Sequence, residues 1–197
     1  MADVYKFKVQ LANLPEKIWR DMKITSVSSV AKLAYAILAA FEGQANHLYN
    51  IQYNGKRYET AFDEAFFGEP AIDPVKTKLS ALKLCVGDTL HMEYDYGAGW
   101  EFVIELLSIT EMKRGRGSHY PCVTDGQGKG IIEDASPYEL EEMIETIDQT
   151  GEIPTIYDID LDQDVPWDYR EFDIINCNIL MRCNLTDIQG AYEGYRE

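Results

Sequence analysis

The sequence lacks any long apolar run. No stretch approaches the roughly 18 uninterrupted apolar residues that a membrane-spanning helix needs, and the first ten residues contain no apolar signal core. Cysteine is also scarce, and the four cysteines lack the close spacing of a disulfide framework: Cys85, Cys122, Cys177 and Cys183. We therefore expect a soluble, cytoplasmic protein with free thiols.

Basic side chains are few. The 197 residues include 18 Lys and Arg against 34 Asp and Glu, which gives a formal net charge of −16. Residues 131–197 alone hold 18 acidic and 3 basic side chains, a net charge of −15. Nucleic-acid binding depends on Lys and Arg contacts to phosphates, so the chain as a whole is predicted to repel nucleic acid. Its acidic half instead favours a basic protein partner.

The sequence does contain enough apolar surface for a folded core. Hydrophobic residues make up 46% of the chain and aromatic residues 12%, which is far from the composition of a disordered protein. The length suits one domain, and neither an internal repeat nor a Ser- or Gly-rich linker divides it. We predict a single domain, in which residues 1–110 form the core and residues 111–197 add a loop and a helical, acidic extension.

Hydrophobic periodicity predicts the elements of the first half. Residues 4–11 alternate between apolar and polar side chains, and residues 18–24 can return as a second strand of a hairpin. A helix is predicted to start after Ser28 or Ser29, because apolar residues then recur at helical spacing. Residues 47–60 carry Asn-Gly between two alternating runs, the pattern of a type I′ hairpin.

The second half begins with a further hairpin. Residues 90–106 alternate on both sides of a glycine-rich turn, whereas residues 111–135 are Gly-rich and predicted to be irregular. Ser136, Pro137 and Glu139 then mark the start of a helix with a capping box. An acidic loop is predicted at residues 157–168, and a last helix at residues 171–184, followed by a short helical or frayed tail to Glu197.

This order of elements is typical of a β-grasp (ubiquitin-like) unit: two strands, a helix, a hairpin, a short helical turn and a long strand. Here one more hairpin strand extends the unit. We therefore predict an α+β fold. In it, a β-grasp-like mixed sheet built from hairpins carries one packed helix and is extended by a C-terminal helical region.

Several short motifs are similar to those of a known family. In order and spacing, over about residues 4–150, the chain resembles the Ri-plasmid ORF-three-like family. The motifs are IWR at 18–20, HL at 47–48, GD at 87–88, YDYGAGW at 94–100, YPC at 120–122, GQG at 126–128 and ED at 133–134. The main positions that carry the resemblance are Trp19, Arg20, His47, Gly87, Asp88, Tyr94, Asp95, Gly97, Gly99, Trp100, Tyr120, Pro121 and Cys122.

The resemblance implies no established biochemical activity. Some members lie beside plasmids and transposable elements, which implies a link to mobile genetic elements. The chain departs from the family at Ala98 and Phe102, where members carry an acidic and an imidazole side chain. These departures weaken any metal or catalytic role that would rest on those two groups.

One polar cluster could hold a divalent metal ion, and no other cofactor is predicted. It would form if the loop at 111–135 folded over the glycine-rich turn, and its candidates are Asp95, His47, His119, Cys122, Glu133 and Asp134. Only His119 and Cys122 have the close spacing of a ligand pair. Alternatively, Asp95 forms the turn through its own side chain and Cys122 is a small buried residue. A Cys122 nucleophile activated by His119 or His47 is a third hypothesis.

Two functions are consistent with these patterns. The preferred one is a non-catalytic protein-binding module, supported by the acidic charge and by aromatic residues expected in exposed loops at Phe66, Phe67, Trp100 and Trp167. The alternative is a metal-assisted, hydrolase-like enzyme that uses the carboxylate and histidine cluster.

A basic strand face deserves a separate hypothesis. Lys6 and Lys8, with Arg20 and Lys23 on the neighbouring strand, could contact single-stranded nucleic acid. The net charge favours an ordinary solvated sheet face instead. The sequence leaves the oligomeric state open.

Overall fold

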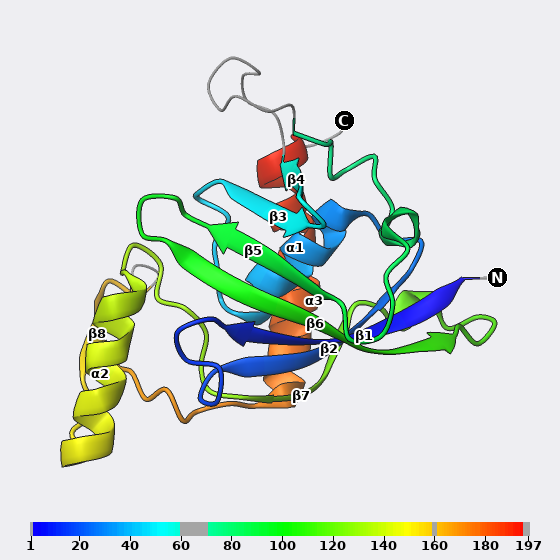
Figure 1. Cartoon of the computed structure of the whole chain (residues 1–197). Coiled ribbons are helices and arrows are strands. Elements are labelled where there is room, and N and C mark those ends of the chain that lie inside the picture. Colours follow the sequence, from blue (N-terminus) through cyan, green and yellow to red (C-terminus); the bar gives the residue numbers. More distant parts are fainter. Residues whose placement is uncertain (1, 60–70, 159–160, 195–197) are drawn as a thin grey trace.

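The computed structural model of the chain describes residues 2–59, 71–158 and 161–194. A seven-stranded sheet forms its body, and two helices, α1 and α3, cover one face of this sheet (Figure 1). The strands of the sheet are β1 (Asp3–Leu11), β2 (Trp19–Thr25), β3 (Tyr49–Tyr53), β4 (Lys56–Glu59), β5 (Thr89–Tyr94), β6 (Trp100–Glu111) and β7 (Cys122–Gln127). The helices are α1 (Val30–Ala40), α2 (Pro137–Thr150) and α3 (Ile174–Glu193), with short 3-10 turns η1 (Leu79–Leu82) and η2 (Gly117–His119).

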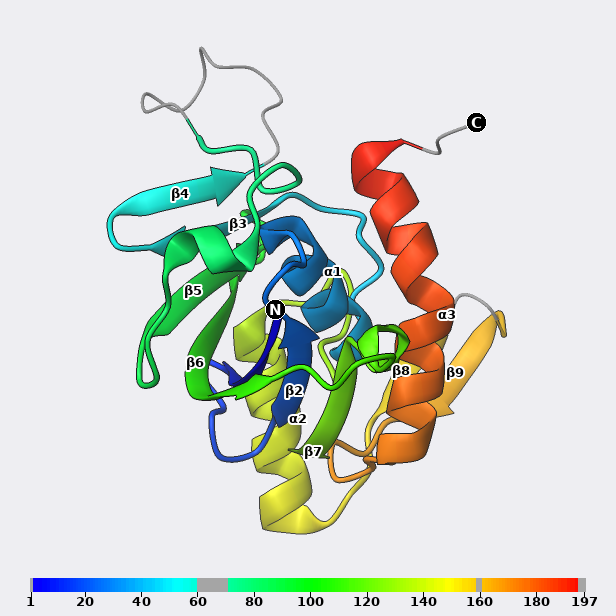
Figure 2. The same cartoon turned by 90° about the vertical axis from the view of Figure 1, so that its right-hand side faces the viewer.

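The sheet runs in the order β4-β3-β5-β6-β1-β2-β7, and each neighbouring pair in it is antiparallel. The α+β class predicted above is confirmed, but the mixed sheet is wrong. Strand β6 turns back from β5 and lies between β5 and β1, so β5 and β1 do not pair with each other. Helix α3, which belongs to the C-terminal helical region, packs beside α1 on the same face (Figure 2).

The first half of the chain folds as its periodicity predicts. The apolar side chains of β1 at positions 5, 7, 9 and 11 are buried, and the polar ones between them are only partly covered. Helix α1 is capped by Ser29, whose side chain accepts a hydrogen bond from the Lys32 amide, and all of its residues except Lys32 are buried. Asn54 and Gly55 both have positive φ angles, as a type I′ turn requires.

The second half departs further from the prediction. The segment 111–135 contains η2 and β7, and β7 forms an edge of the sheet instead of an irregular loop. The acidic segment expected as a loop at 157–168 contributes to a small hairpin of β8 (Thr155–Asp158) and β9 (Gln163–Pro166). In both cases tertiary contacts order a segment that lacks a strong local pattern. Helix α3 starts after its cap residue Asp173 and continues to Glu193, through part of the tail for which a short helical or frayed continuation is predicted.

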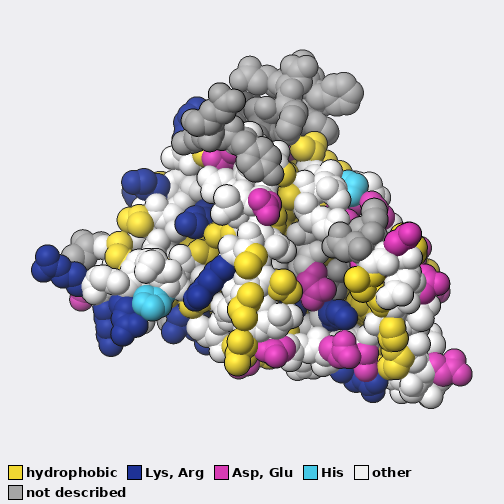
Figure 3. All heavy atoms as spheres, turned by 180° about the vertical axis from the view of Figure 1, so that it is seen from behind, with side chains coloured by type: hydrophobic (Ala, Val, Ile, Leu, Met, Phe, Trp, Pro, Cys, Tyr) yellow, Lys and Arg dark blue, Asp and Glu magenta, His cyan; other side chains and the backbone are white. Residues whose placement is uncertain are grey.

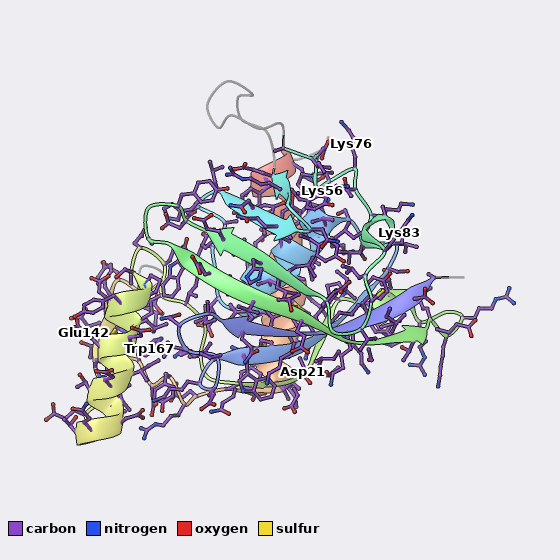
Figure 4. All side chains as sticks on the ribbon, in the orientation of Figure 1. Asp21, Lys56, Lys76, Lys83, Glu142 and Trp167 are labelled. Atoms are coloured by element: carbon purple, nitrogen blue, oxygen red, sulfur yellow. The ribbon has the colours of Figure 1, made fainter. Side chains whose placement is uncertain are left out.

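Helix α2 has the predicted capping box of Ser136 and Glu139 and ends at Gly151, which has a positive φ. Figure 4 shows Glu142 on the outer side of this helix and Trp167 on the side that faces the sheet. Trp167 and Trp100 are buried, so the expectation that both lie in exposed loops is wrong. Phe66 and Phe67 lie outside the described residues. No helix in the described part of the chain is long and apolar enough to cross a membrane.

Candidate functional site

The turn between β5 and β6 positions Asp95. This residue has a positive φ of 54°, and its Oδ1 accepts hydrogen bonds from the amides of Gly97 (3.0 Å) and Ala98 (3.2 Å). Its backbone amide donates to the Leu48 carbonyl at 2.9 Å. Asp95 therefore builds the turn through its side chain, as one of the two interpretations above predicts, and its Oδ2 stays available for other partners.

Glu133 reaches the same region from the loop after β7. One oxygen of its buried carboxylate accepts a hydrogen bond from the Tyr94 hydroxyl, and the other accepts one from the Gln44 amide at 3.0 Å. Burial, and then the hydrogen bond to Glu133, raises the pKa of Tyr94. Because both carboxylate oxygens are held, Glu133 joins the loop before β3 to the end of β5.

His47 lies at the centre of the group. Its Nε2 is 3.5 Å from Asp95 Oδ2, 3.8 Å from Glu133 Oε1 and 3.5 Å from Asp134 Oδ1. The Nε2 atom is buried and has no hydrogen-bond partner in the described part of the chain. The backbone carbonyl of His47 accepts a hydrogen bond from the Tyr192 hydroxyl of α3 at 2.5 Å. Four of the predicted site residues thus converge; we refer to His47, Asp95, Glu133 and Asp134 as the acid–imidazole cluster.

The other two predicted residues lie elsewhere. His119 belongs to η2, where its ring is within hydrogen-bond distance of Arg116. Cys122 starts β7 and pairs with Lys23 of β2, four strands away from β5 in the sheet. Burial raises the pKa of the Cys122 thiol, which opposes a nucleophilic thiolate. The segment 111–135 therefore brings Glu133 and Asp134 close to the turn between β5 and β6. Its other part, with His119 and Cys122, lies at the β7 edge of the sheet.

The acid–imidazole cluster combines donor types that zinc and harder ions accept. As the side chains stand, no group of three or more His, Cys, Asp or Glu residues within the described ranges is arranged to hold a metal ion. Chemically, the arrangement is a group of three carboxylates around one imidazole. It joins the turn after β5 to two loops from other parts of the chain.

A family model described as plasmid pRiA4b ORF-3-like protein matches residues 3–179. The chain belongs to the plasmid pRiA4b ORF-3-like family. Its fold is also similar to the crystal structure of MM3350, a protein of unknown function from Methanosarcina mazei Go1. The sequence identity is 24%, the TM-score is 0.71, and the match covers 89% of this chain and 97% of that one. No curated protein matches the chain.

This family member places its other motif residues mainly in structural roles. Asp88 Oδ2 accepts hydrogen bonds from the Tyr53 hydroxyl at 2.7 Å and from the Cys85 amide at 2.8 Å, which holds the turn before β5. Tyr120 and Pro121 are joined by a cis peptide bond just before β7. Tyr94 and Trp100 pair across β5 and β6, and both are buried.

The hypothesis that Arg20 shares a basic strand face with Lys6 and Lys8 is wrong. Arg20 pairs with Val9, whereas Lys6 and Lys8 pair with Lys23 and Asp21. Directly opposite residues of two strands share a face, so Arg20 lies on the buried face with Val9 and not with the lysines. Lys6 also forms an ion pair with Asp21 at 2.6 Å, which offsets charge on the solvated face. Counting the strand register from a correctly placed turn would have identified Arg20 as a buried residue.

Sequence reasoning also missed the outer face of α3. Ile175, Ile179 and Leu180 are 70%, 53% and 42% exposed. Ile175 and Ile179 are one turn apart, and with Val123 of β7 they line a groove of about 430 Å³ between the helix and the sheet edge. The periodicity of residues 171–184 predicted the helix, but it could not show which apolar residues the sheet would leave uncovered.

Proposed function

We propose that the chain is a non-catalytic protein-binding module that contacts a basic partner through the exposed apolar face of α3. The observation that carries this proposal is the exposure of Ile175 and Ile179, which lie one turn apart on the same face of α3. Apolar side chains that gather in this way on a surface commonly mark an interaction site, whereas single exposed apolar residues do not.

The shape of this surface supports the proposal. Seen from behind the molecule, hydrophobic side chains form a continuous column (Figure 3), on the side where α3 lies in Figure 1. Beside the helix, the groove along β7 has room for apolar side chains of a partner. A helix face next to a groove is a recurrent mode of peptide and protein recognition.

Charge supports a basic partner. The formal net charge is −16, and the outer side of α2 carries Glu142 and Glu145, both exposed. Lys56, Lys76 and Lys83 project at the opposite end of the molecule from α2 (Figure 4). A field of this sign accelerates association with a positively charged protein, and salt screens it.

The test compares capture of host proteins by the parent chain and by Ile175→Ser/Ile179→Ser. Val86→Ser is the matched control, because Val86 is 61% exposed but lies in the turn before β5. We expect a basic partner that binds the parent and the control, binds the double variant at least about tenfold more weakly, and dissociates as salt rises. Equal capture by the double variant, or an acidic partner, would refute the proposal.

A second candidate function is a metal-assisted hydrolase at the acid–imidazole cluster. Its support is the convergence of three carboxylates on Nε2 of His47, an atom that has no hydrogen-bond partner among the described residues. Metal binding to the folded state alone would raise the melting temperature of metal-stripped protein. Asp134→Asn is the informative variant, because the Asp134 side chain is 83% exposed and Asn conserves its size.

Under this candidate function, zinc, manganese or magnesium raises the melting temperature of the parent saturably and that of Asp134→Asn less. Asp187→Asn on α3 serves as the control, because Asp187 is exposed and far along the chain from the cluster. If no ion shifts the parent, or if both variants respond like the parent, the hydrolase hypothesis fails.

The β-grasp topology and a cytoplasmic location belong to the same proposal. Strands β1 to β5 with α1 keep the β-grasp order if β6 is treated as an insertion between β5 and β1. A superposition on β-grasp proteins that omits β6 should align the remaining elements, and misalignment would reject the β-grasp topology.

The cysteines are free, which suits a reducing compartment such as the cytoplasm. Recovery of the protein outside the cytoplasmic fraction would reject that location.

A further inference from the structure

A second cavity lies at the start of α3, on the side of the helix away from the β7 groove. It has a volume of about 440 Å³, and its walls come from the end of α1, from β2, and from the segment 171–180. Pockets of this size accommodate small organic ligands. The charged side chains that line it are Arg20, Glu42, Lys129, Glu171 and Asp173.

Arg20 is the buried charge of this pocket. It is 1% exposed, and its guanidinium lies between the rings of Phe41 (4.9 Å) and Phe172 (4.2 Å). Its Nε donates to the Ala40 carbonyl, and its Nη1 donates to the carbonyls of Trp19 and Gln127. In the described part of the chain its oxygen acceptors are thus backbone carbonyls, and no carboxylate is paired with it. A buried charge of this kind is costly unless a counter-charge approaches it.

The backbone around Arg20 is shaped to admit this arrangement. A Cβ atom at Gly126 would lie 2.7 Å from the Phe172 ring and 2.9 Å from Arg20 Cδ, so only glycine fits beside the stacked pair. The carbonyl contacts use Nε and Nη1, and the Cys177 side chain is a further hydrogen-bond partner of the guanidinium in the cavity that both residues line. A guanidinium that lines a pocket and has no carboxylate paired with it is a preferred group for binding the carboxylate of a ligand.

The other charged side chains of the pocket indicate which second group a ligand with a carboxylate would need. Lys129 is already paired with Glu171 at 3.4 Å, and Glu42 lies near enough to Arg20 to interact with it electrostatically. A bare anion would therefore meet Glu42 and Glu171 as like charges. Ala39, Phe172 and Leu180 supply apolar wall between these groups.

We infer that this pocket binds a small zwitterion of the apolar α-amino acid class. The ligand carboxylate meets the Arg20 guanidinium, the ligand ammonium meets Glu42 or Glu171, and the apolar side chain packs on Phe172 and Leu180. Ile175 and Ile179 line the β7 groove and not this pocket, and no residue of the acid–imidazole cluster lines it either, so its failure would leave both candidate functions standing.

The experiment is calorimetric titration of the full chain, supported by thermal melting. The probes are L-leucine, L-isoleucine, L-valine, L-methionine and L-phenylalanine. Two half-ligands of leucine accompany them: 4-methylpentanoate, which lacks the ammonium, and 3-methylbutylamine, which lacks the carboxylate. We expect saturable binding of at least one amino acid and, for leucine, binding at least about tenfold tighter than that of either half-ligand.

Three results would overturn the inference. The first is no binding of any of the five amino acids at about 10 mM. The second is binding of 4-methylpentanoate as tight as that of leucine, because Glu42 and Glu171 would then contribute nothing to binding. The third is binding of 3-methylbutylamine as tight as that of leucine, because Arg20 would then contribute nothing.

Variants locate the site. Arg20→Met should weaken binding about 30-fold or more, as expected when one partner of a buried charge pair is removed. This variant could also unfold, because Arg20 holds three carbonyls together. Asn176→Trp is therefore the second variant: Asn176 is exposed and lines the pocket, so the new ring should block the cavity without disturbing the buried network. Arg182→Gln, on another face of α3, is the control; binding that survives Asn176→Trp would place the ligand elsewhere.

Discussion

The Oδ2 atom of Asp95 lies 3.5 Å from Nε2 of His47, while Oδ1 of the same carboxylate holds two amides of its own turn. One side chain thus shapes the turn between β5 and β6 and also ties it to the loop before β3. The two roles use different oxygens, so substitutions can separate them.

For Asp95, the structure predicts a difference between two substitutions. Asparagine keeps an oxygen acceptor for the turn and tolerates a positive φ, whereas alanine loses both advantages. We expect Asp95→Ala to lower the free energy of unfolding by about 1–3 kcal/mol and Asp95→Asn by clearly less. Urea unfolding of both variants measures this, and equal losses would mean that the contact to His47 matters more than the turn.

A second prediction concerns the pH dependence of the contact between Tyr53 and Asp88. The hydrogen bond to Asp88 raises the pKa of Tyr53 to about 12, and the hydrogen bonds from the Cys85 amide and from Tyr53 lower the pKa of Asp88. A raised tyrosine pKa gives stability that is present below about pH 10 and is lost between about pH 10 and 12. A lowered aspartate pKa gives stability that is present above about pH 4 and is lost as the pH falls through the folded-state value.

The parent and Tyr53→Phe should therefore differ most in stability between about pH 5 and 9, and the difference should shrink on both sides. Chemical denaturation at a series of pH values measures it. A constant difference across the whole range would contradict the assigned hydrogen bond.

The close approach at Gly126 gives a third prediction. Gly126→Ala would push a methyl group into the stacked Arg20 and Phe172 side chains. We expect a loss of about 1–3 kcal/mol, as for other overpacked sites. Gly117→Ala is the matched control, because nothing lies within 4 Å of its added Cβ and its φ is not positive. Thermal melting of the two variants should differ clearly, and similar melting temperatures would argue against this packing.

Asn178 carries the fourth prediction, because it closes the edge of the sheet. Its side-chain oxygen accepts from the Val123 amide and its side-chain nitrogen donates to the Val123 carbonyl, both at 2.9 Å. The amide group thereby takes the place of a neighbouring strand along β7. Asn178→Ala should leave both backbone groups unsatisfied and lower stability by about 1–3 kcal/mol.

Hydrogen exchange provides the specific readout for this edge. The Val123 amide should exchange faster in Asn178→Ala, and Asn178→Asp should protect it partly, because an aspartate keeps the acceptor and loses the donor. Asn184→Ala, at an exposed position on the same helix, should leave exchange at Val123 unchanged. Unchanged exchange in Asn178→Ala would show that the edge is protected in another way.

Local patterns in the sequence determined much of the first half of this protein. The alternation in β1, the Ser29 cap of α1, the Asn54-Gly55 turn and the Ser136 capping box each depend on residues close together in the chain. Steric and hydrogen-bonding rules act over that short range, so these elements could be predicted one by one. The family resemblance was likewise readable, because its motifs are short and ordered.

Only the tertiary structure decided how these elements meet. The insertion of β6 between β5 and β1, the recruitment of β7 to the edge and the uncovered face of α3 all depend on contacts between distant segments. Six residues were candidates for one site from the sequence. In the structure, the sheet order places His119 and Cys122 at one edge, whereas His47 lies close to Asp95 and Glu133. Likewise, the register of β2 against β1 buried Arg20, because a shift of one residue moves a side chain to the opposite face of a sheet.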